Sequence, residues 1–143
     1  MKPIMAKREK PITNMTMATA GIGAVGSKVA ILGLTFKEDC PDLRNSRVPD
    51  IVTELRAYGC EVLVHDPFCD PSETLEEYGI TITLHENLPR VSALILAVAH
   101  KMYKEWTPQE WIEHLLPQGV VIDVKNLVPL KQLEESGYRV WKL

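Results

Sequence analysis

The sequence predicts an α/β fold: a doubly wound, mostly parallel sheet of five to six strands, held between two layers of helices in an αβα sandwich. Two observations lead to this fold class. Short apolar runs, typical of strands covered on both faces, recur from Lys28 to the end of the chain. Segments with apolar residues at helical spacing lie between these runs, so that strands and helices alternate. Parallel strands joined by helices take right-handed crossovers, which place helices on both faces of the sheet.

Six segments are predicted to be strands. Two of them, KVAILGL and SALILAVA, are apolar almost throughout, as expected for strands in the middle of a parallel sheet. The final one is short and suits an edge of the sheet. In chain order the predicted strands are Lys28–Leu34, Glu61–His65, Ile80–Leu84, Ser92–Ala99, Gly119–Val124 and Tyr138–Trp141.

The first predicted helix follows the first strand after a polar loop. Ser46 or Asn45 can cap its start, because both side chains accept hydrogen bonds from unpaired backbone N–H groups. Gly59 can end the helix, since glycine adopts the left-handed conformation at little cost. Apolar residues at i, i+3, i+4 and i+7 give this helix one buried face: Val48, Ile51, Val52 and Leu55.

Three further helices are marked by the residues at their ends. Asp70 and Pro71 suit the N-cap and first position of a helix that ends at Gly79, and a last helix runs from Pro129 to Gly137.

Between these two lies a third helix, for which Thr107 and Glu110 form a capping box around Pro108. This helix is expected to continue until Pro117 stops it. Its buried stripe is predicted to be Trp111, Ile112, Leu115 and Leu116.

Composition and charge limit the possible functions. The chain of 143 residues is 45% hydrophobic and 24% charged, which fits one soluble globular domain. A net charge of −3 argues against broad nucleic-acid binding, and no apolar run is long enough to cross a membrane. The three cysteines are odd in number and lack CxxC spacing, so neither a disulfide framework nor a zinc site is expected. A reducing cytoplasm is the expected location.

Residues 1–27 differ from the rest of the chain. They show no sustained helical or strand period, so they are predicted to be a flexible leader or linker remnant, with the domain occupying residues 28–143. Gly21, Gly23 and Gly26 spell G-x-G-x-x-G, the dinucleotide-binding pattern. That pattern must follow a strand and open a helix, whereas here it precedes a strand, so the linker interpretation is favoured.

The loop between the first strand and the first helix is the strongest candidate for a binding site. It holds Lys37, Arg44 and Arg47 at the expected carboxyl edge of the sheet, where α/β proteins bind ligands. Cations there suit an anionic ligand, and an arginine can hold a phosphate by two hydrogen bonds. The alternatives are a solvated surface lysine and arginines paired with the acids of the same loop, Glu38, Asp39 and Asp42.

Other polar residues follow the remaining strands. Lys125 comes just after the fifth strand, at the same expected edge. Asp66 could bind a ribose, but His-Asp-Pro is also typical of a turn, and the turn is favoured. His100 is expected to be structural. Cys40 is rejected as a nucleophile because acids surround it and no base is evident beside it.

The segment GLTFKEDCPDLRNSRVPDIV (residues 33–52) resembles the start of the C-terminal, UDP-sugar-binding domain of the UDP-glucose/GDP-mannose 6-dehydrogenase family. The E-D-C-P-D-x-R-N-S variant is most similar to members acting on UDP-N-acetylhexosamines (GlcNAc, GalNAc, ManNAc) in polysaccharide synthesis, including the Vi-antigen type. VLVHDP, LILAVAHKMY and VVIDVKNL follow in the same order as in the family. The resemblance covers about residues 27–143 and implies a Rossmann-like sheet that binds the UDP-sugar.

The resemblance also implies roles for single residues. The lysine of the family's F-K pair contacts the sugar nucleotide, and here that is Lys37. The arginine of the D-x-R segment reaches toward NAD across the domain interface, and here that is Arg44. The basic residue after the later strand contacts the substrate, and here that is Lys125, although Asn126 stands where many relatives have glycine.

The family oxidises the sugar C6 alcohol to a carboxylate in two NAD-dependent steps, using an NAD-binding domain and a central domain with a nucleophilic cysteine. The sequence contains no Gly-Gly-x-Cys segment, so this chain alone is expected to be inactive and to lack both domains. We therefore expect a UDP-sugar-binding module, with NAD relevant only in a complete enzyme. Two alternatives stay open: a subunit that works with a separately encoded NAD-binding partner, and a non-catalytic fragment with an interaction role, such as self-association into a homo-oligomer.

Overall fold

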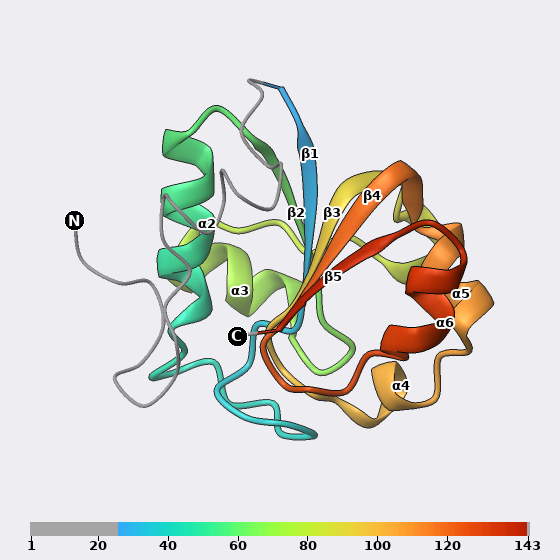
Figure 1. Cartoon of the computed structure of the whole chain (residues 1–143). Coiled ribbons are helices and arrows are strands. Elements are labelled where there is room, and N and C mark those ends of the chain that lie inside the picture. The colour runs from blue at the N-terminus through green and yellow to red at the C-terminus, as the bar shows by residue number, and fades with distance from the viewer. Residues whose placement is uncertain (1–25, 143) are drawn as a thin grey trace.

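The computed structural model describes residues 26–142, which form a three-layer αβα sandwich (Figure 1). A five-stranded sheet lies in the middle, with helices on both faces. This confirms the predicted fold class. The strands are β1 (Lys28–Leu32), β2 (Glu61–His65), β3 (Val91–Leu96), β4 (Leu115–Asp123) and β5 (Arg139–Lys142).

All neighbouring strands of the sheet run parallel, in the order β2-β1-β3-β4-β5. At the carboxyl end of β1, Leu32 lies opposite His65 of β2 and Leu96 of β3. Leu96 in turn lies opposite Asp123 of β4. The segments that leave β1, β2, β3 and β4 therefore all start from the same edge of the sheet.

The helices divide between the two faces (Figure 1). α2 (Val48–Ala57) and α3 (Pro71–Tyr78) lie on one side, and α5 (Pro108–Glu113) and α6 (Leu130–Glu135) lie on the other. The short helix α4 (Lys101–Lys104) follows β3 at the carboxyl edge, and a 3-10 turn, η1 (His85–Asn87), precedes β3. No helix among residues 26–142 combines the length and the apolar character that a membrane span needs.

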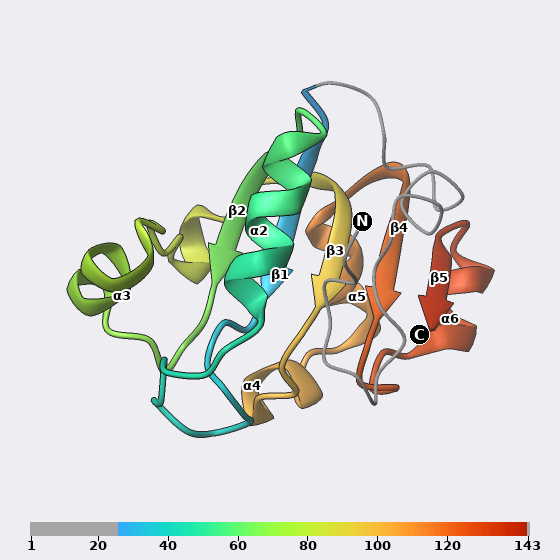
Figure 2. The ribbon, with the colours of Figure 1, turned by 90° about the vertical axis from the view of Figure 1, so that its left-hand side faces the viewer.

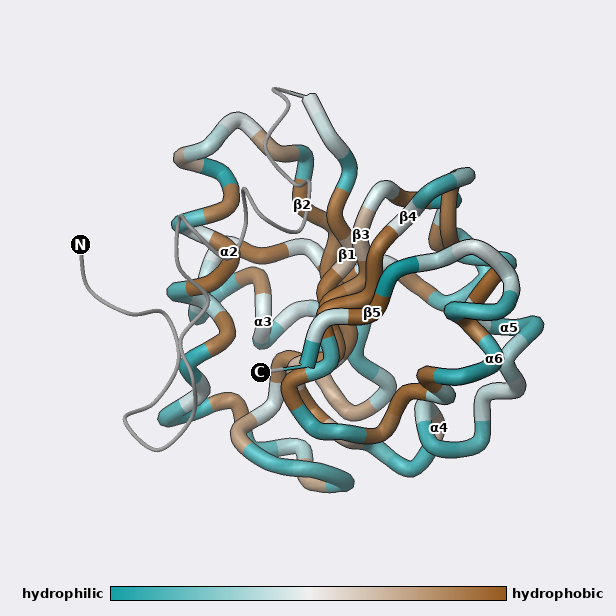
Figure 3. The backbone as a smooth tube through the Cα atoms, viewed as in Figure 1, coloured by the Kyte–Doolittle hydropathy of each residue, from teal (hydrophilic) through white to brown (hydrophobic). Residues whose placement is uncertain are grey.

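Successive side chains of the strands point alternately into two apolar cores, one on each face of the sheet. Val29 and Ile31 of β1 belong to the core under α2, whereas Ala30 and Leu32 belong to the core under α4–α6. Successive side chains of a strand point to opposite faces, so a continuous apolar run is required when both faces are covered. Figure 3 shows this as apolar colouring along the central strands and polar colouring on the outer loops.

The predicted helix ends are mostly confirmed. Asp70 caps α3 by accepting hydrogen bonds from two backbone N–H groups, and Gly79 ends that helix in the left-handed conformation. Thr107 and Glu110 form the capping box of α5. The prediction for α2 is only partly right: its N-cap is Arg47, although the Ser46 hydroxyl does accept a hydrogen bond from the Val48 N–H at 3.2 Å.

Two predicted elements are wrong. Ile80–Leu84 is not a strand, because it pairs with β2 only through a single bridge between Ile82 and Val64. The helix before Pro117 ends at Glu113, and Leu115 already belongs to β4. Proline disfavours the helical conformation of the residue before it, which excludes Leu116 from the helix.

The predicted leader, residues 1–27, lies almost entirely outside the described residues, as do Gly21 and Gly23 of the G-x-G-x-x-G pattern. Gly26 is described, and its N–H donates to the carbonyl oxygen of Gly59. The segment after Gly26 enters β1 directly, so Gly26 stands before a strand as the sequence predicts.

Candidate functional site

The candidate site is built on the loop between β1 and α2, residues 33–47, which runs beneath the carboxyl edge of the sheet toward α4 (Figure 2). The loop begins at Gly33, whose φ of +99° lies in the range that favours glycine. Its N–H donates to the carbonyl oxygen of His65 at 2.8 Å. Lys37 is exposed in this loop. Among residues 26–142, no carboxylate forms an ion pair with its ammonium group.

Asp66 anchors the start of this loop. It follows β2 directly and is only 4% exposed. Its Oδ2 accepts hydrogen bonds from the N–H groups of Leu34 at 2.6 Å and Thr35 at 3.0 Å. Its Oδ1 accepts from the Phe68 N–H at 2.7 Å, which is the turn predicted from His-Asp-Pro. Both carboxylate oxygens are therefore already engaged by the protein.

The charge of Asp66 is favoured by this setting. Burial alone would raise the pKa of the carboxyl group, but hydrogen bonds from His100 and from the Leu34 and Thr35 N–H groups outweigh burial and hold the pKa below its usual value. A buried anion thus stabilises the backbone that leaves β1.

His100 connects the ends of three strands. Its side chain is fully buried, and Nε2 lies 2.8 Å from Asp66 Oδ2 and 3.1 Å from Thr35 Oγ1. Nδ1 accepts a hydrogen bond of 2.8 Å from the N–H of Asp39. The Asp39 carboxylate then accepts from the N–H of Lys101 at 2.8 Å, which ties the loop to α4.

The sequence predicts a turn at Asp66 and a structural role for His100, but not that the two form one network around the β1–α2 loop, residues 33–47, called the Lys37 loop below. The sequence contained only part of the signal, namely that each of the two residues follows a strand. Asp66 directly follows β2, and His100 comes soon after β3. These two strands flank β1 in the sheet, so polar residues after them converge on the segment that follows β1.

Lys125 lies in the loop after β4, and Asp123 organises that loop. Asp123 Oδ1 accepts from the Lys125 N–H at 3.0 Å, and Oδ2 accepts from the N–H groups of Leu127 and Val128 at 2.8 and 2.9 Å. Asn126 has a φ of +57°, a conformation that asparagine tolerates better than most residues. Asn126 therefore supports the same kind of turn as a glycine would.

Lys37 and Lys125 are carried by loops that start from the same edge of the sheet. β1 and β4 lie on either side of β3, so the strand ends that carry the two loops are two strand spacings apart. Two spacings amount to about 10 Å. The two loops therefore leave the sheet on either side of the end of β3.

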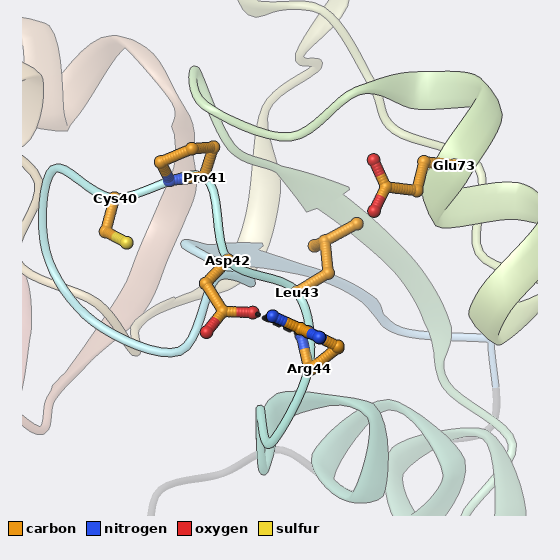
Figure 4. Close-up of a pocket in the computed structure, with 6 residues that line it drawn as sticks. All are labelled: Cys40, Pro41, Asp42, Leu43, Arg44 and Glu73. Atoms are coloured by element: carbon orange, nitrogen blue, oxygen red, sulfur yellow. Dashed lines mark hydrogen bonds and ion pairs between the residues drawn. The ribbon is translucent and has the colours of Figure 1, made fainter.

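Arg44 lies farther along the β1–α2 loop, at an open cavity of ≈ 460 Å³ (Figure 4). Its guanidinium Nε is 3.6 Å from Asp42 Oδ1, so the predicted alternative, pairing with an acid of the same loop, is present. The Arg44 side chain is nevertheless 84% exposed, and exposed ion pairs are weak. The cavity is lined by Cys40, Pro41, Asp42, Leu43, Arg44 and Glu73.

The part of the β1–α2 loop next to Arg44 is also held in place by hydrogen bonds. The hydroxyl of Tyr78, the last residue of α3, donates a hydrogen bond to the carbonyl oxygen of Leu43. The N–H of Phe36 donates to the carbonyl oxygen of Asp42 at 2.8 Å, which closes the loop on itself. Among residues 26–142, no group of three histidine, cysteine or acidic side chains is placed to bind a metal ion.

The chain is similar in sequence to a known protein family and to several of its members. Residues 30–129 match the UDP-glucose/GDP-mannose dehydrogenase family, UDP binding domain. UDP-N-acetyl-D-glucosamine 6-dehydrogenase from Salmonella typhi is 39% identical over 116 residues, which cover 81% of this chain and 27% of that protein. Protein CapL from Staphylococcus aureus is 37% identical over 123 residues, which cover 86% of this chain and 28% of that protein.

A solved structure supports the same fold. NDP-N-acetyl-D-galactosaminuronic acid dehydrogenase from Methanosarcina mazei Go1 superposes with a TM-score of 0.75 at 24% identity, over 88% of this chain and 26% of that one. The chain thus spans little more than a quarter of the length of these relatives. The family match includes the loops of Lys37, Arg44 and Lys125. On this evidence the chain belongs to the UDP-glucose/GDP-mannose dehydrogenase family, whose UDP binding domain it contains.

Proposed function

We propose that this domain binds the nucleotide part of a UDP-sugar, as the C-terminal domain of an NAD-dependent UDP-sugar 6-dehydrogenase of polysaccharide biosynthesis. The observation that carries the proposal is the exposed Lys37 on an anchored loop at the carboxyl edge of a parallel sheet, within the family's UDP binding domain. The name of the relative from Salmonella typhi favours a UDP-N-acetylhexosamine, with UDP-glucose as the second candidate.

The charges of the site suit a diphosphate. Lys37 offers an ammonium group on a flexible stem, which acts as a point charge toward phosphate oxygens. Lys125 offers a second ammonium group from a loop on the other side of β3. The two would hold the diphosphate from both sides, and the anchored backbone would limit the entropy lost when the ligand orders the loop.

We infer that NAD, in a complete enzyme, is held mainly by residues outside those that the structure describes. The β1–α2 loop is GLTFKEDCPDLRNSR, which lacks the glycine pattern that brings a backbone close to a pyrophosphate. The acid after β2, Asp66, has both oxygens engaged by backbone N–H groups and His100. We therefore assign Arg44 only the role of one cation that reaches a cofactor held elsewhere in a complete enzyme.

Isothermal titration calorimetry with UDP, UDP-N-acetylglucosamine, UDP-glucose and inorganic phosphate tests the proposal. We expect saturable binding of UDP and of at least one UDP-sugar, and no comparable binding of free phosphate at the same concentration. Equal affinity for UDP and inorganic phosphate would overturn the proposal, because it would leave a non-specific cation cluster. Stronger binding of the N-acetylated sugar nucleotide than of UDP-glucose would identify the substrate class.

A further inference from the structure

We propose that His100 is a positioning residue, whose imidazole fixes the backbone on both sides of Lys37 and so sets where the Lys37 ammonium stands at the sheet edge. The consequence for ligand affinity rests on the function proposed above. The structural part, an ordered Lys37 loop, can be measured without any ligand.

The two ring nitrogens of His100 contact the two sides of Lys37. On the amino side, Nε2 lies 3.1 Å from Thr35 Oγ1, and the same hydroxyl donates to the carbonyl oxygen of Lys37 at 3.1 Å. On the carboxyl side, Nδ1 accepts from the N–H of Asp39 at 2.8 Å. Lys37 is the middle residue between these two attachments, so its backbone is restrained although its side chain is exposed.

The contacts define which ring nitrogen carries the proton. A backbone N–H can only donate, so the Asp39 contact requires an unprotonated Nδ1. The proton must then sit on Nε2, where it faces Asp66 Oδ2 at 2.8 Å. The Thr35 hydroxyl, having given its own hydrogen to Lys37, presents only lone pairs to the same nitrogen. Asp66 therefore holds His100 in the tautomer that keeps Nδ1 open for the loop.

Asp39 is a demanding position for this attachment. Its φ of +54° is uncommon for a residue other than glycine. Its N–H and its carboxylate are both used, toward His100 and toward the N–H of Lys101. Aspartate adopts this conformation more readily than most residues, and two contacts hold it here, one of them from His100.

Two substitutions separate the ring nitrogens. His100→Gln keeps a donor near the position of Nε2 and removes the acceptor for the Asp39 N–H. His100→Asn places an amide oxygen near the position of Nδ1 and loses the donor to Asp66. We expect His100→Gln to weaken UDP binding roughly three- to tenfold, the effect of one hydrogen bond. We expect His100→Asn to bind UDP more tightly than His100→Gln while having the lower melting temperature, because it leaves the Asp66 charge short of a partner.

Amide hydrogen exchange measures the loop directly. We expect the Asp39 N–H to exchange faster in His100→Gln than in the wild type and to be partly protected again in His100→Asn. Nitrogen-15 spectra of the wild-type imidazole should show the Nε2-protonated tautomer. Unchanged Asp39 exchange in His100→Gln would overturn the inference. Faster exchange in His100→Gln, together with no UDP binding by the wild type, would overturn only the proposed function.

A general loss of stability must be distinguished from mispositioning. Leu133→Ala removes a fully buried side chain from the core on the α4–α6 side of the sheet. It should lower the melting temperature without changing UDP affinity. In a double-mutant cycle, His100→Gln should add nothing to the loss caused by Lys37→Ala, because His100 acts through Lys37. Fully additive losses would contradict the inference.

Discussion

Gly33 and Val98 approach each other so closely that no side chain fits between them. A Cβ atom on Gly33 would lie 2.5 Å from the Cβ of Val98 and 2.8 Å from its backbone nitrogen. The contact brings the start of the Lys37 loop against the segment that follows β3, where His100 lies two residues beyond Val98. The absence of a side chain at position 33 is therefore what allows the buried network to reach the loop.

Gly33→Ala should be strongly destabilising. It adds a clash with backbone and Val98 atoms to the strain of a φ of +99°. Strain and overpacking of this kind together cost roughly 2–5 kcal/mol. The matched control is Gly137→Ala, since Gly137 has a φ of +92° but nothing within 4 Å of the added Cβ. Urea unfolding should show the larger loss for Gly33→Ala, and equal losses would mean that only the backbone conformation matters.

Removal of Lys37 or Lys125 should weaken UDP binding. Each substitution to alanine removes one charge-assisted contact to the diphosphate, worth about 1.5–3 kcal/mol, or at least tenfold in affinity. Lys28→Ala is the matched control, because Lys28 begins β1 at the opposite edge of the sheet and carries the same charge. Calorimetry that shows equal UDP affinity for Lys28→Ala and Lys37→Ala would contradict the placement of the ligand.

Much of this fold could be predicted because local signals agreed with the tertiary structure. β2 and α3 have the predicted bounds, since strand periodicity, an N-cap aspartate and a terminal glycine all act within a few residues. Ile80–Leu84 failed because an alternating apolar pattern does not show whether a partner strand continues beside it. Only Ile80 of its three large apolar residues is buried, and Leu84 is 50% exposed.

The charged residues of the candidate site could be predicted from the sequence, but the hydrogen bonds that hold their loop could not. Lys37 and Arg44 were identified from their loop, and their binding roles stay predictions. The hydrogen bonds between Asp66, His100 and Asp39 join residues more than thirty positions apart, so no local pattern reports them. Only the strand order β2-β1-β3 brings these residues together, and that order follows from the crossovers rather than from any single segment.

The three cysteines should differ in reactivity. Burial raises the pKa of the Cys69 thiol to about 12, with the nearby Asp66 charge acting in the same direction, and burial also raises the pKa of Cys60. Both thiols should stay protonated and shielded in the folded protein, whereas Cys40 is partly exposed in the loop. A thiol reagent at about pH 8, near the pKa of a free cysteine, should label Cys40 first, with the other two reacting only in denaturant. Rapid labelling of Cys69 in the folded chain would contradict its burial.

Acid should destabilise the protein through His65. The side chain is 4% exposed at the end of β2, and its Nδ1 lies 2.7 Å from the Tyr103 hydroxyl. Burial, followed by the charge of His85, lowers its pKa from 6.5 to about 4, and the opposing charge of Asp66 does not compensate. His114 shifts in the same direction for the same reasons.

Proton linkage gives the direction in which the free energy of unfolding changes with pH. Between pH 6.5 and about 4 the unfolded chain binds a proton at position 65 that the folded chain does not. The contribution of His65 to the free energy of unfolding should therefore be complete above pH 6.5. It should decline as the pH drops toward 4, by up to about 3 kcal/mol. Urea unfolding of the wild type and of His65→Asn at about pH 7 and about pH 4.5, which bracket most of that window, should show the smaller loss in the variant. An equal loss in both proteins would mean that other groups, such as His114, cause the acid sensitivity.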